Sequence, residues 1–393
     1  MNRAKHIIFI FILISIKLRA MNSSRTDSRI IRTALTGITI SFGLLSYILL
    51  QSYDFVQAQT QNITNVIQTN NNSESKFYIP PTISKEVQEI LKNLTTNLPS
   101  FPFIPNPDDS EGWQRLNQQT SPIVTQFSRS IVDSYQPNIT PTELADISVL
   151  DIKPEDWNDN GKVLVYLHGG GYTLLGANST LGNVVPVANS TGLRVISVDY
   201  SLAPFSKWNQ TTDEVVSVIQ ALMDQGYSLN DIAMYGDSAG GGLVAGSVLK
   251  MRDQGLGMPA ALVLWSPWTD VTGIGDTYFT LSDADPFITN DSQRDMAAAY
   301  AHPSDQTHPY VSPVYGNFSS GFPPTLIQGG TKEMLLSDFV RLYQALDQAG
   351  IPVKLDIYEG MPHVFQTFFF HNTTESNLAI SKTNDFLKEY LDY

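Results

Sequence analysis

From residue 161 onward, the chain alternates short, continuous apolar runs with longer segments of helical periodicity. A strand made entirely of apolar residues must be buried on both faces, and helices between such strands cover those faces. The pattern therefore predicts an α/β fold in which a mostly parallel central sheet carries helices on both sides. The predicted strands are 162–167, 193–198, 232–235, 261–265, 325–328 and 353–358.

A serine lies among small residues directly after the third of these strands. Residues 235–242 read YGDSAGGG, which places Ser238 at the centre of a G-x-S-x-G pattern between a predicted strand and a predicted helix. This is the arrangement of a nucleophile elbow, a sharp turn that exposes a serine hydroxyl. The same letters also fit an ordinary Gly/Ser turn. The strand before and the helix after favour the elbow.

A glycine run, HGGGY, follows the first predicted strand. Backbone N–H groups in such a run can converge on one point, as acyl transfer requires for the negative charge of its tetrahedral intermediate. We expect the amides of Gly169, Gly170, Gly171 and Ala239 to form an oxyanion hole. Alone, the run fits a flexible loop or a phosphate-binding turn equally well, and its occurrence together with Ser238 favours acyl transfer.

A serine hydroxyl needs a base that takes its proton, and the base needs an acid that orients it. Among the six histidines, His363 follows the last predicted strand and comes after the serine in the chain, as this type of site requires, and His371 is the alternative. The acid should lie after the next-to-last strand, where Glu333 is the first carboxylate. Asp338 is the alternative there, although a helix N-cap is its expected role. The predicted catalytic residues are Ser238, Glu333 and His363, with no metal and no cofactor.

Taken together, the motifs resemble the hormone-sensitive-lipase-like branch of the α/β-hydrolases, which includes many microbial esterases. The likeness covers nearly all of residues 80–393, and its matching pieces occur in the order HGGGY, DYSLAP, GDSAGG, SPWTD, DADPF, SPVYG, PPTLIQGGTKEMLLSD and EGMPHVFQ. The resemblance implies an α/β-hydrolase fold, the same triad and oxyanion hole, and a helical cap over the acyl pocket. After DYSLAP the chain departs from the family, because FSKWNQ replaces the usual acidic residue and prolines.

This chemistry predicts a serine carboxylic ester hydrolase, a carboxylesterase or lipase type of enzyme that acts on small to medium acyl esters through an acyl-enzyme. The alternatives are a lipase for longer-chain lipids and a non-catalytic small-molecule receptor on the same fold. The chain carries a formal charge of −14, and since residues 1–58 hold seven Lys or Arg against two Asp or Glu, the remainder carries −19. So acidic a body argues against nucleic acid as a partner and favours a neutral or apolar ester. A homodimer is a further option.

The N-terminal region predicts export. An apolar stretch from Ala34 to Leu50 follows three arginines, as in a signal peptide or a signal anchor, and small residues up to Ala58 fit cleavage there. Ten Asn-x-Ser/Thr triplets between Asn62 and Asn372 suggest a glycoprotein. We therefore expect a protein of the secretory pathway, secreted or anchored in the membrane, with its catalytic domain lumenal or extracellular.

The predicted domain layout has three parts. A signal peptide or anchor spans residues 1–58, and a flexible polar stalk spans residues 59–79. The α/β-hydrolase domain spans residues 80–393, of which residues 80–150 are expected to be largely cap helices and residues 151–393 the catalytic core.

Overall fold

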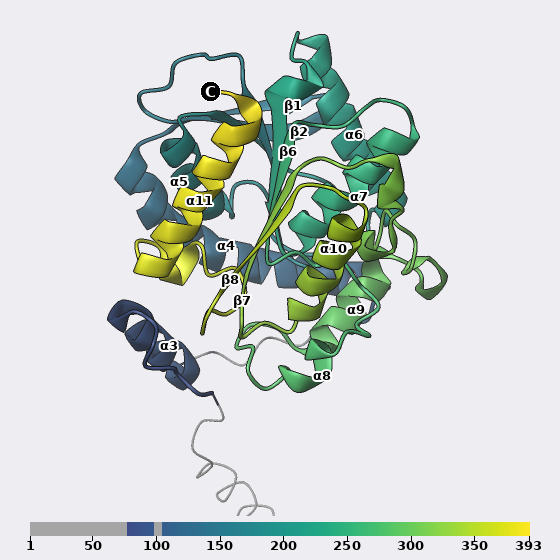
Figure 1. Ribbon diagram of the computed structural model, residues 1–393. Coiled ribbons are helices and arrows are strands. Elements are labelled where there is room, and N and C mark those ends of the chain that lie inside the picture. Colours follow the sequence, from purple (N-terminus) through teal and green to yellow (C-terminus); the bar gives the residue numbers. More distant parts are fainter. Residues whose placement is uncertain (1–76, 98–103) are drawn as a thin grey trace, which may run out of the picture. The chain divides into compact units, whose positions relative to one another are not determined.

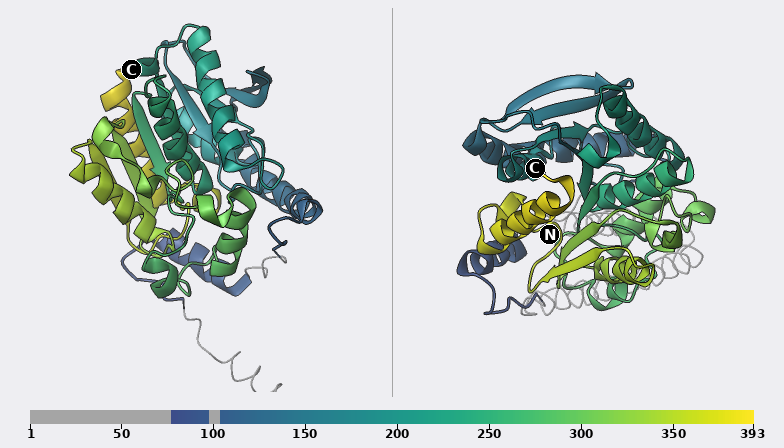
Figure 2. Two further views of the ribbon diagram at one scale, coloured as in Figure 1. Left: turned by 90° about the vertical axis from the view of Figure 1, so that its right-hand side faces the viewer. Right: turned by 45° about the horizontal axis from the view of Figure 1, so that its top comes forward.

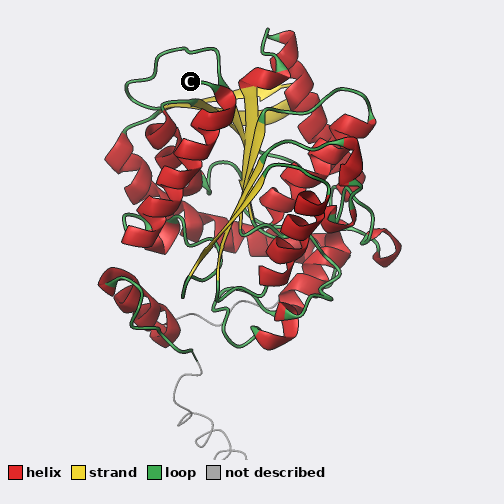
Figure 3. Cartoon of the chain, viewed as in Figure 1, coloured by secondary structure: helices red, strands yellow, loops and turns green. Residues whose placement is uncertain are grey.

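The computed structural model describes residues 77–97 and 104–393. Of the two units into which the chain divides, the second, Ser75–Tyr393, is compact and contains every described residue. The predicted leader, and the predicted stalk up to residue 76, lie outside the described residues. Within the second unit, strands lie between two layers of helices (Figure 3).

The central sheet has eight strands in the order β1-β2-β4-β3-β5-β6-β7-β8. The strands β3 to β8 run parallel, whereas β1 pairs antiparallel with β2 and β2 with β4. The prediction of a mostly parallel sheet is therefore confirmed. The strands are β1 Asn138–Leu144, β2 Ile147–Lys153, β3 Val163–Leu167, β4 Arg194–Val198, β5 Ile232–Asp237, β6 Ala261–Trp265, β7 Thr325–Gly330 and β8 Val353–Tyr358.

The sheet begins earlier in the chain than the sequence analysis expects. The predicted boundary between cap and core, at residue 150, falls inside β2, so β1 and β2 belong to the sheet. Only Leu144 is buried in β1, and only Val149 and Ile152 are buried in β2. Most side chains of β1, at the edge of the sheet, and of β2 beside it are therefore not buried, and neither strand carries the continuous apolar run that identified the other six.

Helices cover both faces of the sheet (Figures 1 and 2). Side chains of α5 and α11 form the core on one face, and those of α6, α7 and α10 form the core on the other. The helices are α3 Lys85–Asn97, α4 Ser110–Tyr135, α5 Leu181–Thr191, α6 Trp208–Asp224, α7 Ala239–Asp253, α8 Thr277–Thr280, α9 Asn290–Tyr300, α10 Leu336–Gln348 and α11 Thr374–Leu391.

The side chains of β3 pack into the helical layers on both faces of the sheet. Val163, Val165 and Leu167 pack with the helices of one face, and Leu164 and Tyr166 pack with those of the other. All five side chains are fully buried. Since successive side chains of a strand point to opposite faces, a strand between two helical layers must be apolar at every position.

The helix α3 packs against the start of α11. Ser84 donates its backbone N–H and its hydroxyl to the carboxylate of Glu375, both at 2.7 Å. In return, Thr374 donates its backbone N–H, at 3.2 Å, and its hydroxyl, at 2.7 Å, to Glu86. The apolar side of α3 packs in the same cluster as Met361, in the loop after β8. The first described helix thus supports the loop that follows the last strand.

The middle of α7 offers a test of this packing. Replacing Gly by Ala in a helix interior usually stabilises it, by about 0.5–1 kcal/mol. At Gly246, however, a Cβ would overlap the backbone carbonyl oxygen of Tyr310. We therefore expect Gly246→Ala to lower the free energy of unfolding by about 1–3 kcal/mol, measured by urea denaturation.

The neighbouring Ser247 provides the matched control. Its side chain is fully buried and its hydroxyl has no hydrogen-bond partner in the described part of the chain. Ser247→Ala should therefore change the free energy of unfolding by less than about 1 kcal/mol. A Gly246→Ala protein as stable as the parent would contradict the close approach of α7 to residue 310.

Candidate active site

Ser238 occupies a strained turn between β5, which ends at Asp237, and α7, which begins at Ala239. Its backbone angles are φ 53° and ψ −123°, a conformation that residues other than glycine rarely adopt. The turn is held by the backbone N–H of Ser238, which donates to the carbonyl of Trp265 at 2.8 Å, and by its carbonyl, which accepts from Trp268 at 2.9 Å. The hydroxyl therefore has a defined position above the sheet.

The second glycine of the elbow has a steric role. A Cβ on Gly240 would overlap the carbonyl oxygen of Leu167, the last residue of β3. The start of α7 and the end of β3 therefore approach closely at this point. Because HGGGY directly follows Leu167, this approach brings the glycine run beside Ser238.

The structure brings together the three side chains that the sequence predicts as a triad. Nε2 of His363, in the loop after β8, lies 2.9 Å from Oγ of Ser238. Nδ1 of the same ring lies 2.8 Å from Oε2 of Glu333, in the loop after β7. Three separate loops thus supply one continuous chain of hydrogen bonds.

Burial and charge act in opposite directions on His363. Its side chain is 10% exposed and that of Glu333 is fully buried. Burial is the largest single effect and lowers the pKa of His363. The hydrogen bond and the charge of Glu333, together with the charges of Asp285 and Asp237, raise it, and the pKa lies above its ordinary value. With Glu333 ionised, Nδ1 carries the proton that it donates, and Nε2 is left to accept the proton of Ser238.

Neither alternative residue lies in this chain of hydrogen bonds. The carboxylate of Asp338 accepts from the backbone N–H groups of Thr269 and Asp270, at 2.9 and 2.8 Å. It is also not the N-cap that the sequence suggests, because the N-cap of α10 is Leu335. The ring of His371 packs edge-on against Tyr135, with 5.7 Å between ring centroids.

The glycine run differs from the prediction at one position. The backbone N–H of Gly169 donates to Oδ1 of Asp237 at 3.2 Å, and is therefore already engaged. Within the described residues, the amides of Gly170, Gly171 and Ala239 donate no hydrogen bond. These three amides, and not that of Gly169, are therefore available to donate to an oxyanion. Spacing alone could not separate Gly169 from its neighbours, because its partner comes from another loop.

Two residues beside this site were missed by the sequence analysis. The hydroxyl of Ser266 donates to Oε1 of Glu333 at 2.9 Å. The buried carboxylate of Asp285 accepts from the backbone N–H of Met334 at 3.1 Å, and burial raises its pKa to about 6, although the nearby His363 lowers it. The motifs SPWTD and DADPF contain them, but nothing in either motif indicates a partner that is distant in sequence.

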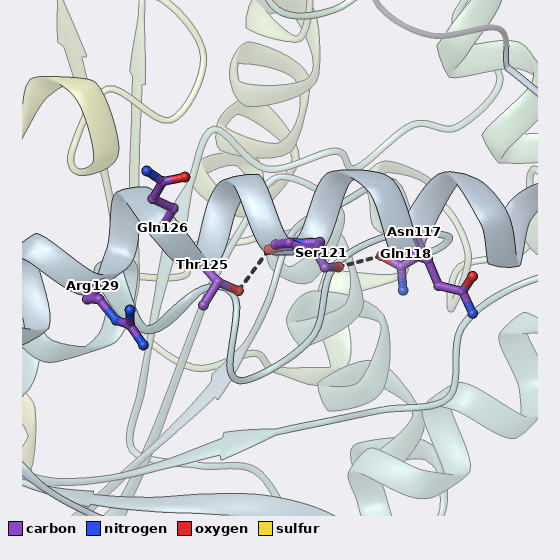
Figure 4. Close-up of a pocket in the computed structure, with 7 residues that line it drawn as sticks. Asn117, Gln118, Ser121, Thr125, Gln126 and Arg129 are labelled. Atoms are coloured by element: carbon purple, nitrogen blue, oxygen red, sulfur yellow. Dashed lines mark hydrogen bonds between the residues drawn. The ribbon is translucent and has the colours of Figure 1, made fainter.

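A pocket of about 620 Å³ lies elsewhere, on α4 (Figure 4). None of Ser238, Glu333 and His363 lines it, and its described lining comes from a single helix, so we do not assign it to the substrate. Its lining residues are Asn117, Gln118, Ser121, Pro122, Thr125, Gln126 and Arg129. Across residues 77–97 and 104–393, no group of three or more His, Asp or Glu is arranged to hold a metal ion.

Comparison with known proteins agrees with this geometry. The sequence model of the alpha/beta hydrolase fold family matches residues 164–367. The chain belongs to the α/β-hydrolase fold family. It is 33% identical to an acetyl-hydrolase of Streptomyces hygroscopicus over 230 residues, an alignment that covers 58% of this chain and 76% of that protein. It is 31% identical to an esterase of Acinetobacter venetianus over 248 residues, an alignment that covers 63% of this chain and 81% of that protein.

Solved structures agree with this assignment to the α/β-hydrolases. The crystal structure of esterase E25 has a TM-score of 0.75 against this chain, with 28% identity over 81% of this chain and 98% of that one. An esterase of the bacterial hormone-sensitive lipase family has a TM-score of 0.67 with 27% identity, over 78% and 99%. The predicted fold and the predicted resemblance to the hormone-sensitive-lipase-like branch are confirmed. This α/β-hydrolase is a carboxylic ester hydrolase.

The comparisons contradict the predicted localisation. The two relatives named above, an acetyl-hydrolase and an esterase, are bacterial proteins. No helix in the described ranges is long and apolar enough to cross a membrane, and the stretch from Ala34 to Leu50 lies outside those ranges. We therefore withdraw the secreted or membrane-anchored assignment, together with the signal and glycoprotein predictions. Asn-x-Ser/Thr is a short pattern that a chain rich in Asn, Ser and Thr produces by chance.

The hydrogen bond between His363 and Glu333 predicts that the pKa of His363 depends on the charge of Glu333. We expect NMR of the ring protons to give His363 a pKa above the ordinary value of about 6.5. Glu333→Gln removes the charge that favours the imidazolium, so the pKa of His363 should fall below that of the parent protein. Glu389→Gln, which removes an exposed carboxylate paired with Lys354, is the control and should leave it unchanged. Equal pKa values in the parent and Glu333→Gln would contradict the pairing.

Proposed function

We propose that Ser238, His363 and Glu333 act as nucleophile, base and orienting acid in ester hydrolysis. The observation that carries the proposal is the uninterrupted chain from Oγ of Ser238 through the imidazole to Glu333, with distances of 2.9 and 2.8 Å. A serine hydroxyl becomes a competent nucleophile when a base in hydrogen-bond reach accepts its proton and an acid holds that base in the correct tautomer.

The reaction then has two similar halves. Oγ of Ser238 attacks the ester carbonyl carbon while its proton passes to Nε2 of His363, and the tetrahedral intermediate forms. The amides of Gly170, Gly171 and Ala239 donate to its oxyanion. Collapse of the intermediate releases the alcohol, which takes the proton from His363, and leaves the acyl-enzyme. Water repeats the sequence and releases the acid.

We propose small to medium acyl esters as substrates. Bulky side chains lie beside the glycine run: a Cβ on Gly171 would overlap Sδ of the partly buried Met296, and the buried Tyr172 stacks on Tyr300 with 3.7 Å between ring centroids. Little space is therefore left for a long chain on that side. The name of the acetyl-hydrolase from Streptomyces hygroscopicus supports the same proposal. The acidic composition favours neutral over anionic esters.

We also propose that residues 80–393 form the catalytic domain. In this proposal, β1 and β2 belong to the core, and α4 takes the place of the predicted cap. The homodimer stays a prediction.

Replacing the nucleophile tests the assignment. Ser238→Ala should lower kcat for p-nitrophenyl butyrate by about 10⁴-fold or more, and should not react with a fluorophosphonate probe that labels the parent protein. Ser247→Ala, which removes a buried hydroxyl outside the site, is the matched control and should keep full activity. A parent protein that the probe does not label would instead favour the receptor alternative.

The acyl chain length has its own test. We expect the highest kcat/KM for one of the short esters, p-nitrophenyl acetate, butyrate or hexanoate. For the dodecanoate and palmitate esters kcat/KM should fall steeply, because a long acyl chain must displace Met296 or Tyr300. A maximum at palmitate would favour the lipase alternative. Met296→Ala should shift the preference toward longer chains if this side chain limits the acyl group.

A further inference from the structure

Ser266 follows the last residue of β6 and has an unusual backbone. Its φ is 46°, in the left-handed region that favours glycine, and its side chain is fully buried. The conformation is held by its backbone N–H, which donates to the carbonyl of Gln328 at 2.7 Å. A strained residue at a buried position points to a role for its side chain.

The hydroxyl of Ser266 connects two loops of the site. It donates to Oε1 of Glu333 at 2.9 Å and accepts from the backbone N–H of Val364 at 3.0 Å. Val364 directly follows His363 and itself has a φ of 51°. One hydroxyl thus contacts both the acid and the backbone that carries the base.

The two contacts define the geometry of the Glu333–His363 pair. Oε1 of Glu333 also accepts from the backbone N–H of Gly330, at 2.5 Å. With Oε1 held from two sides, Oε2 has one direction in which to meet Nδ1 of His363. The hydrogen bond from the backbone N–H of Val364 fixes the backbone next to His363, and with it the position of the imidazole relative to Oε2. Because Val364 donates to the hydroxyl, the hydroxyl proton is directed to Glu333.

We propose that Ser266 is a positioning residue of the esterase reaction, which sets the Glu333–His363 distance from both sides without touching the substrate. This proposal rests on the proposed roles of Glu333 and His363. Burial alone does not account for these contacts, because the hydroxyls of the fully buried Ser197 and Ser247 have no partner in the described chain.

Removing the hydroxyl should slow the chemical step. We expect Ser266→Ala to lower kcat for p-nitrophenyl butyrate about 10- to 100-fold and to change KM less than about twofold, since misplaced catalytic groups act on the transition state. Ser247→Ala is the control and should keep the kcat of the parent. The full chain is used throughout.

A glycine variant separates the hydroxyl from the backbone. Ser266→Gly also lacks the hydroxyl, but glycine adopts a positive φ without strain. We expect it to unfold at a temperature no lower than Ser266→Ala and to show the same fall in kcat. It also replaces Ser266→Ala as the test if the alanine variant does not fold. A Ser266→Gly enzyme with the kcat of the parent would overturn the proposal.

A double-mutant cycle with Glu333→Ala tests whether Ser266 acts through the acid. If it does, Ser266→Ala in the Glu333→Ala background should lower kcat less than about twofold further. A full 10- to 100-fold further loss would assign Ser266 a separate structural effect and overturn the proposal. If Glu333→Ala alone keeps the kcat of the parent, the triad assignment fails and this proposal fails with it. If Glu333→Ala is impaired and Ser266→Ala is not, only the role of Ser266 fails.

Discussion

The close approach between the end of β3 and the start of α7 is the constraint on which the site depends. Leu167 ends β3 and leads directly into the glycine run, while Gly240 lies two residues after Ser238. Because no Cβ fits between them, backbone packing alone places the serine beside the amides of Gly170 and Gly171. A site held by the backbone of strands and helices is more rigid than one held by side chains in loops. Ser238 and these amides therefore form one unit, and His363 and Glu333 reach it from two other loops.

Buried carboxylates bring these loops together. A buried charge is tolerated only where donors surround it, so each such acid also fixes the segments that supply the donors. Asp237 joins the elbow to the glycine run through the N–H of Gly169. Asp285 joins its own loop to the loop of the acid through the N–H of Met334. Glu333 accepts from the backbone, from Ser266 and from His363. Together these acids connect the elbow, the glycine run and the loops after β7 and β8.

The errors of the sequence analysis have physical causes. Most side chains of β1, at the edge of the sheet, and of its neighbour β2 are not buried. Neither strand carries a continuous apolar run, so the predicted boundary at residue 150 fell inside the sheet. Gly169 was predicted as an oxyanion donor together with Gly170 and Gly171, because the sequence does not show that its backbone N–H donates to Asp237. The predicted export depended on an apolar stretch and on sequence triplets, and both are too short and too common to decide a compartment.

The sequence by itself determined the parallel sheet, the elbow at Ser238 and the residue types of the site. Apolar runs, glycine spacing and the order of motifs along the chain indicate these features without any knowledge of which loops meet. It narrowed the base to His363 or His371 and the acid to Glu333 or Asp338. Only the tertiary structure shows that His363 and Glu333, and not their alternatives, are hydrogen-bonded in line with Ser238, since that depends on which loops meet. It alone revealed Ser266, because a hydrogen bond between residues separated by 67 or 98 positions leaves no trace in the local pattern.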